Sequence, residues 1–206
     1  MRNLEKRRLS MMRNIREVKV SQNQLLNQQV IKHALLEEGV DSQDIELHIN
    51  IIEFQSLNRK YRGIGIMNSK GGYEFYNRSI MDYPVCVGKK GLTIIPGTGE
   101  KKEIACCFHD SLDYMAWFSY MQSQNNNSSK MMDCYIMGDF STFSDLMKVA
   151  DKYDKVLCYF HNTQCGEVML STLKEKAKKA TVVDRSCLYK SFECMRYYWM
   201  DLLTRK

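Results

Sequence analysis

Two stretches of the chain share a pattern in which a short apolar run ends on a histidine and a helical pattern follows. The first spans residues 104–117 and reaches its histidine at His109, and the second spans residues 155–167 and reaches it at His161. Apolar runs of this length are typical of strands buried on both faces of a parallel sheet. Because parallel strands end at one sheet edge, His109 and His161 are predicted to lie at the edge where open α/β folds build their sites.

From residue 104 onward, predicted strands and helices alternate. The predicted strands are 104–109, 133–137, 155–161 and 180–184, and the predicted helices are 111–122, 144–152, 163–179 and 191–204. Strands separated by helices of this length require right-handed crossovers, which produce a parallel sheet. This half of the chain is therefore predicted to be an α/β domain with helices on its sheet.

The first hundred residues have a different pattern. Residues 24–38 carry apolar positions at helical spacing, and Gly39 follows as a C-cap residue, which predicts a helix. Residues 45–55 alternate as in a strand, with a phase slip that indicates a bulge. Residues 61–76 contain two apolar runs around the turn residues 68–71, which predicts a hairpin. We therefore expect one helix and a small, largely antiparallel sheet.

A glycine- and lysine-rich stretch, residues 88–102, marks a boundary between these two parts. The prediction is a basic arm over residues 1–23, a small α+β subdomain over residues 24–100 and the α/β domain over residues 103–206.

The net charge of +6 is concentrated in the first 20 residues, which hold seven basic and two acidic residues and so carry +5. Apolar positions at helical spacing, ending at Val18, predict a basic amphipathic helix. Two interpretations stay open, because such an arm either contacts a nucleic-acid backbone or is a solvated terminus. An organellar presequence fits less well, since the arm contains two glutamates and few serines. The basic residues are Arg2, Lys6, Arg7, Arg8, Arg13, Arg16 and Lys19.

The apolar runs are too short to cross a bilayer and the N-terminus lacks a signal-peptide core, so a cytoplasmic location without membrane contact is expected. The eight cysteines contain no C-x-x-C pair, which argues against a structural zinc ribbon. Four of them fall inside predicted strands, where a free cysteine behaves as a small hydrophobic residue. Reduced thiols are expected.

Four segments stand out by their order and spacing. They are residues 62–75 (RGIGIMNSKGGYEF), residues 105–117, residues 156–161 with Gly166 after them, and residues 182–190 (VVDRSCLYK). Together they resemble the Toprim-containing, primase-like proteins carried on mobile elements of gut Bacteroidales, over the chain from about Val30 to the C-terminus. The resemblance implies a Toprim-like parallel sheet flanked by helices. Relatives often carry a Cys/His zinc ribbon ahead of this region, and this sequence has none.

The resemblance also implies a site whose expected carboxylates are replaced here. A Toprim site has a glutamate at the end of its first strand, where this sequence has His109, and an Asp-x-Asp at the end of its third, where it has His161 and Thr163. The C-terminal acidic pair falls near Cys194 and Tyr197. Magnesium binds through carboxylate oxygens, so histidine and threonine are poor replacements and the magnesium site is expected to be lost.

Three hypotheses for the function stay open. In the preferred one, the chain is a catalytically degenerate, primase-like protein without a metal that binds nucleic acid or acts as an accessory protein. In the second, His109, His161 and Asp110 or Asp113 form a two-histidine, one-carboxylate site for zinc, manganese or iron in a primase, nuclease or phosphotransfer enzyme. In the third, Asp110, Asp113 and Glu167 form a shifted magnesium site. The simpler interpretations are histidines that hydrogen-bond at helix N-termini and acids favoured by the helix dipole.

Overall fold

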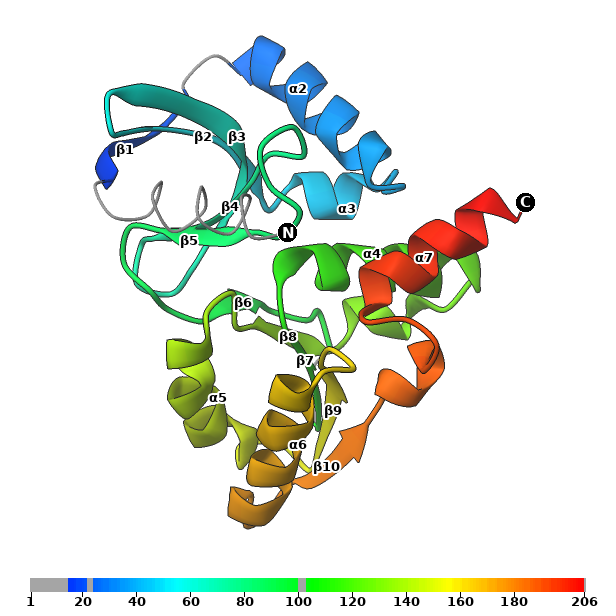
Figure 1. Cartoon of the computed structure of the whole chain (residues 1–206). Coiled ribbons are helices and arrows are strands. Elements are labelled where there is room, and N and C mark those ends of the chain that lie inside the picture. The colour runs from blue at the N-terminus through cyan, green and yellow to red at the C-terminus, as the bar shows by residue number, and fades with distance from the viewer. Residues whose placement is uncertain (1–14, 22–23, 100–102, 206) are drawn as a thin grey trace.

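The computed structural model describes residues 15–21, 24–99 and 103–205, and within them the strands form two five-stranded sheets. The first sheet has the order β1-β2-β3-β4-β5 and is antiparallel throughout. The second has the order β10-β9-β7-β8-β6 and is parallel except for the β6–β8 pair. Figure 1 shows the first sheet above the second, with α4 and α7 between them.

Most elements lie close to where the sequence pattern predicts them. The first sheet consists of β1 (Ile15–Val20), β2 (Ile49–Ser56), β3 (Arg59–Met67), β4 (Tyr73–Tyr76) and β5 (Val85–Val87). The second consists of β6 (Thr93–Ile95), β7 (Ile104–Phe108), β8 (Asp133–Ile136), β9 (Lys155–Tyr159) and β10 (Thr181–Asp184). The α-helices are α2 (Gln24–Glu37), α3 (Gln43–Glu46), α4 (Ser111–Ser123), α5 (Phe143–Ala150), α6 (Gln164–Lys176) and α7 (Met195–Thr204). The short 3-10 helices are η1 (Asn127–Lys130), η2 (Phe140–Thr142) and η3 (Ser186–Tyr189).

Strands β7 and β9 are adjacent and parallel, as predicted. Cys106 pairs with Leu157 and Phe108 pairs with Tyr159, so the two chains leave the sheet at the same edge. Helices α5 and α6 lie on one side of this sheet, and α4 and α7 lie on the side facing the first sheet (Figure 1). The arrangement confirms the predicted parallel α/β sheet flanked by helices.

Consecutive side chains of β7 enter two different cores. Ala105 and Cys107 pack with residues of α5 and α6, whereas Cys106 and Phe108 pack with residues of α4, α7 and the first sheet. Because both faces of the strand are covered, its sequence is apolar without alternation. The core that contains Cys106 and Phe108 continues into the first sheet. Strand β6, which lies inside the predicted boundary stretch of residues 88–102, pairs with β8.

The predicted basic helix does not extend through Val18, because residues 15–20 form strand β1 along the edge of β2. Arg16 pairs with Gln55 and Lys19 with Glu53, so β1 holds one extra residue between these pairs. Glu17, with φ of 48°, lies in this bulge. The extra residue sets Ile15 and Val18 three positions apart although both pack on the same core, and this spacing imitates a helix.

Residues 45–48 do not belong to a strand, contrary to prediction. Ile45 lies in α3, where its side chain is buried, and β2 begins at Ile49. The predicted bulge is also absent from β2, which pairs with β3 in unbroken register. Ile51 and Ile52 are both buried because both faces of β2 are covered, and two-sided burial produces the apparent phase slip.

Two turns predicted from their residues are confirmed. After α2, Gly39 takes a φ of +71°, and the N–H of Val40 donates to the carbonyl of Leu35, which closes a Schellman motif. In the β3–β4 hairpin the Asn68 side chain accepts hydrogen bonds from the N–H groups of Lys70 and Gly72. Among the described residues, no helix combines the length and the apolar character needed to cross a bilayer.

Candidate functional site

The two strand-end histidines come together at the carboxyl edge of β7 and β9. Their imidazole rings stack, with centroids 4.0 Å apart and an interplanar angle of 14°. The lone pair of an imidazole nitrogen lies in the plane of its ring, so two stacked rings direct their lone pairs within separate planes. His109 and His161 therefore do not point at one common ion, and this geometry does not support the two-histidine metal site.

His161 is paired with Asp113, in the first turn of α4. The imidazole Nε2 lies 2.7 Å from Asp113 Oδ2 and 3.6 Å from Asp110 Oδ2. Asp113 Oδ1 accepts the backbone N–H of Arg196 at 3.1 Å. Asp113 is 1% exposed and His161 is 8% exposed, so the pair is buried. We call Asp110, Asp113, His161 and Cys194 the ionisable cluster.

Burial and charge act against each other in this cluster. Burial lowers the pKa of His161, but the hydrogen bond that His161 donates to Asp113 and the negative charges of Asp113 and Asp110 outweigh it and raise that pKa to about 9. His161 is therefore an imidazolium at neutral pH. Burial and the neighbouring charge of Asp113 raise the pKa of Asp110 to about 6, against the attraction of His161.

Two of the sequence-predicted site residues act as helix caps. Asp110 Oδ1 accepts the N–H groups of Leu112 at 3.0 Å and Asp113 at 3.1 Å, at the start of α4. Thr163 Oγ1 accepts the N–H of Gly166 at 3.2 Å, at the start of α6. Glu167 lies exposed in the first turn of α6, outside the buried ionisable cluster. The structure thus brings together Asp110, Asp113 and His161, but not Glu167.

Glu74 is a site residue that the sequence analysis missed. It lies in β4, is 3% exposed, and accepts the backbone N–H of Ser111 through Oε1 at 2.8 Å. Burial, followed by the charge of Asp110, raises its pKa to about 8, so it is mostly protonated at neutral pH. Its Oε2 has no hydrogen-bond partner within the described part of the chain. A glutamate inside the apolar run Tyr73–Tyr76 was the local signal for a buried acid.

Cys194 completes the ionisable cluster from the start of α7. One ligand atom each of Asp113, His161 and Cys194 lies within 4.8 Å of the other two, and Cys194 is buried. Burial and the charge of Asp113 raise the pKa of its thiol well above the usual range. The Tyr83 ring lies beside the cluster, with its centroid 6.1 Å from that of His161, and its hydroxyl donates to Glu193 at 3.0 Å.

Arg196 connects the site to the first sheet. Its Nε donates to Glu38 Oε2 at 2.7 Å, and its Nη2 donates to the Tyr76 hydroxyl at 2.8 Å. Glu38 is also paired with Arg78 at 3.1 Å. Because the backbone of Arg196 binds Asp113 while its side chain binds Glu38, α7 joins α4 to both the end of α2 and strand β4.

Comparison with known proteins identifies the fold. No family model matches the sequence, and no curated protein matches it. Among solved structures, the chain is similar to the crystal structure of the primase fragment of the bacteriophage T7 primase-helicase protein, with a TM-score of 0.50 and 11% sequence identity over 82% of this chain and 69% of that chain. The chain has a primase-like fold. At this identity the likeness concerns the fold alone.

Within this primase-like fold, the residues present do not fit a magnesium ion. Magnesium keeps an octahedral shell of oxygen ligands and binds through carboxylates and water. Both aspartates at the sheet edge already accept hydrogen bonds within the protein. Asp110 accepts two backbone N–H groups through Oδ1. Asp113 accepts the backbone N–H of Arg196 and a hydrogen bond from the imidazolium of His161. A hard cation would have to displace a positive charge that lies 2.7 Å from Asp113.

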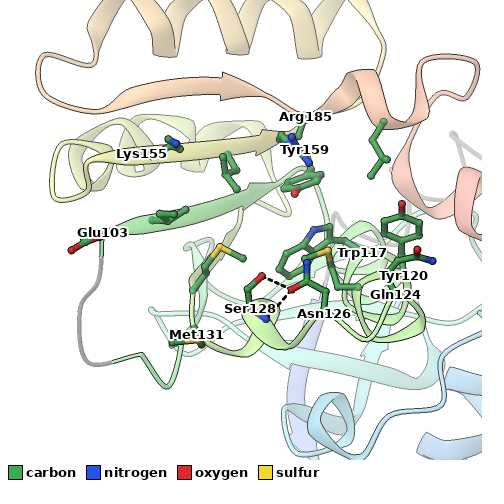
Figure 2. Close-up of a pocket in the computed structure, with 15 residues that line it drawn as sticks. Glu103, Trp117, Tyr120, Gln124, Asn126, Ser128, Met131, Lys155, Tyr159 and Arg185 are labelled. Atoms are coloured by element: carbon green, nitrogen blue, oxygen red, sulfur yellow. Dashed lines mark hydrogen bonds between the residues drawn. The ribbon is translucent and has the colours of Figure 1, made fainter.

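A separate cavity of about 620 Å³ lies on the α4 side of the second sheet (Figure 2). Figure 2 shows Trp117 and Tyr159 next to each other in its lining, with Arg185 beside Tyr159. The lining also includes Glu103 and Lys155, where β7 and β9 begin. The ionisable cluster lies where these strands end, so the cavity is not part of it.

Most of the predicted nucleic-acid-binding arm lies outside the described residues, namely Arg2, Lys6, Arg7, Arg8 and Arg13. Arg16 and Lys19 are in β1, and the Lys19 ammonium pairs with Glu17 at 3.0 Å on the surface. Contact of this arm with nucleic acid stays a prediction.

Proposed function

We propose that this chain is a primase-like protein that has lost magnesium-dependent catalysis and acts as a nucleic-acid-binding or accessory protein of a mobile element. The observation that carries the loss of catalysis is the buried pair of His161 and Asp113. A positive imidazolium stands where the resemblance expects an aspartate for the metal. The imidazolium thereby compensates the negative charge of Asp113 within the protein.

Support for nucleic-acid binding comes from two features. The first is the fold, which is similar to that of the primase fragment of a primase-helicase protein. The second is the charge, because the first 20 residues carry +5 of the net charge of +6. Phosphate contacts by lysine and arginine dominate non-specific affinity for nucleic acid, so the arm is the part of the chain suited to that role. Four sequence segments support the placement among mobile-element proteins of Bacteroidales.

The loss of catalysis is tested by restoring the carboxylates. The variant His109→Glu, His161→Asp, Thr163→Asp should bind magnesium in calorimetry, whereas the natural chain should not. The matched control His109→Gln, His161→Asn, Thr163→Asn has similar side-chain sizes without the charges and should not bind it. Primer synthesis or strand cleavage by the natural chain with magnesium, abolished by a chelator, would overturn the proposal.

Nucleic-acid binding is tested by salt titration with and without residues 1–14. This deletion removes five of the seven basic residues and leaves β1 in place, so the first sheet keeps its edge strand. Each phosphate contact contributes a slope of roughly −0.7 to −0.9 in log affinity against log salt. The deletion should therefore reduce the slope by about 3 to 5 on single- and double-stranded substrates. Absence of binding at low salt, or an unchanged slope, would contradict the role of the arm.

A second candidate is a metal-dependent nucleic-acid enzyme with a rebuilt site. The observation that favours it is the presence of three buried carboxyl groups, those of Glu74, Asp110 and Asp113, near the N-terminus of α4. The stacking of His109 on His161 weighs against the two-histidine form of this hypothesis. The same chelator-sensitive activity assay separates this candidate from the proposed function.

A further inference from the structure

The ionisable cluster contains the three ligand types that a borderline divalent ion prefers. Asp113 offers a carboxylate from α4, His161 an imidazole from the end of β9, and Cys194 a thiol from the start of α7. Their ligand atoms lie within 4.8 Å of one another, and the residues are between 1% and 8% exposed. These residues are far apart in sequence, and the fold places them around one point.

We propose that Asp113, His161 and Cys194 form a binding site for a zinc-class divalent transition ion. Zinc binds thiolate sulfur at about 2.3 Å and imidazole nitrogen or carboxylate oxygen at about 2.0–2.2 Å, which sets tetrahedral ligand atoms roughly 3.3–3.8 Å apart. The separation of 2.7 Å between His161 and Asp113 would open by less than about 1 Å to admit the ion. Asp110 Oδ2, 3.6 Å from His161 Nε2, is a candidate fourth donor.

The exchange of protons for the ion conserves the charge of the buried site. An incoming divalent ion displaces the imidazolium proton of His161 and the thiol proton of Cys194, so two positive charges enter and two leave. A coordinate bond to Nε2 replaces the N–H bond of His161, and one to Sγ replaces the S–H bond of Cys194. Both protons pass to the solvent, and no oxidant or reductant is required. A buried site tolerates such an exchange because it does not change the net charge.

The ligand set selects the class of ion. Thiolate and imidazole favour zinc, cobalt and iron over magnesium, whose shell consists of oxygen atoms. His109 is excluded from the set because its ring is stacked on that of His161 and lies in a different plane. The ion would tie α7 to α4 and to the end of β9. This role requires neither catalysis nor nucleic-acid binding, so it is independent of the proposed function.

The experiment uses the full chain, produced without a histidine tag, stripped with a chelator and titrated with cobalt(II). We expect one equivalent to bind, with the visible absorption of a tetrahedral ion and a near-ultraviolet sulfur-to-cobalt charge-transfer band, and zinc should displace it. Cys194→Ser should lose the charge-transfer band, and His161→Gln should weaken binding at least tenfold. The matched control Cys165→Ser should keep both, since Cys165 is exposed and is not a ligand.

A measurement on the natural chain keeps the proposal testable if the Cys194 variant does not fold. X-ray absorption of the zinc-loaded protein should show one sulfur and three nitrogen or oxygen ligands. A shell without sulfur, binding of no cobalt by the stripped chain, or a charge-transfer band that persists in a folded Cys194→Ser variant would overturn the proposal.

Discussion

The β7–α4 and β9–α6 units have the same local design, but the helix of the first is buried and the helix of the second is exposed. We call them the buried unit and the exposed unit. Each strand is followed by a histidine, a capping residue and a helix with an acid in its first turn, Asp113 in α4 and Glu167 in α6. In α4 every residue from Ser111 to Phe118 is buried, whereas most of α6 faces solvent. Accordingly Asp113 is buried and paired with His161, and Glu167 is exposed.

The difference shows that the two units are complementary halves of one site. An acid in the first turn is favoured by the helix dipole in both units, by a few tenths to about 1 kcal/mol. Inside the protein that gain does not offset the cost of burying a charge, which needs an opposite charge nearby. The histidine that ends the second strand supplies that charge to the acid of the first helix.

The largest effect is expected from removal of His161 in metal-free protein. His161→Leu leaves Asp113 buried without its partner, which should lower the free energy of unfolding by about 4 kcal/mol. Chemical denaturation in the presence of a chelator measures it. Glu167→Gln, at the matching place in α6, should change stability by less than about 0.5 kcal/mol. If Asp113→Asn in the His161→Leu background does not recover part of the loss, the buried charge is not the cause.

A second large effect is expected at α7, which packs against α4. Arg196→Met removes the guanidinium from Glu38 and should cost about 3 kcal/mol, less than the His161 variant because Arg78 still pairs with Glu38. The control is Arg205→Met at the C-cap of the same helix, which breaks a surface pair with Asp201 worth at most about 1 kcal/mol. Equal losses of stability for the two variants in thermal or chemical unfolding would contradict the larger contribution of the buried Arg196–Glu38 pair.

A third effect concerns pH, through Glu74 beside the buried helix. Its pKa rises from an ordinary 4.5 to about 8 on folding. Between these two pH values the carboxyl is protonated in the folded state and ionised in the unfolded state. The resulting stability is fully present below pH 4.5 and is lost as the pH rises through 8. Between pH 6 and pH 9 the resulting loss in the free energy of unfolding is about 2–3 kcal/mol. In Glu74→Gln, whose amide does not titrate, unfolding stability should fall less over this range, and an equal fall would contradict the assignment.

The sequence identified the elements that depend on local patterns. Continuous apolar runs located β7 and β9, and the strand ends located His161 and the first turn that contains Asp113. Glu74 and Arg196 were missed because their partners lie 37 and up to 158 residues away, which no periodicity encodes. The strand β1 was mistaken for a helix because its bulge imitates helical spacing. Local chemistry was therefore predictable, and pairing across the fold was not.

The smallest effect is expected at Thr163, where the resemblance implies a metal-binding aspartate. This position tests the difference between the two units most directly, because Thr163 caps the exposed helix α6. Thr163 Oγ1 accepts the N–H of Gly166, so Thr163→Ala should cost about 1 kcal/mol as a lost N-cap. Thr163→Asp should leave stability unchanged or slightly higher, because aspartate caps at least as well and its charge favours the helix N-terminus. Its carboxylate would then accept the same N–H and should bind no magnesium while His161 remains. Chemical denaturation of both variants, with and without magnesium, measures these effects. A magnesium-dependent gain in stability for Thr163→Asp alone would show that the exposed unit can form a metal site without the buried one.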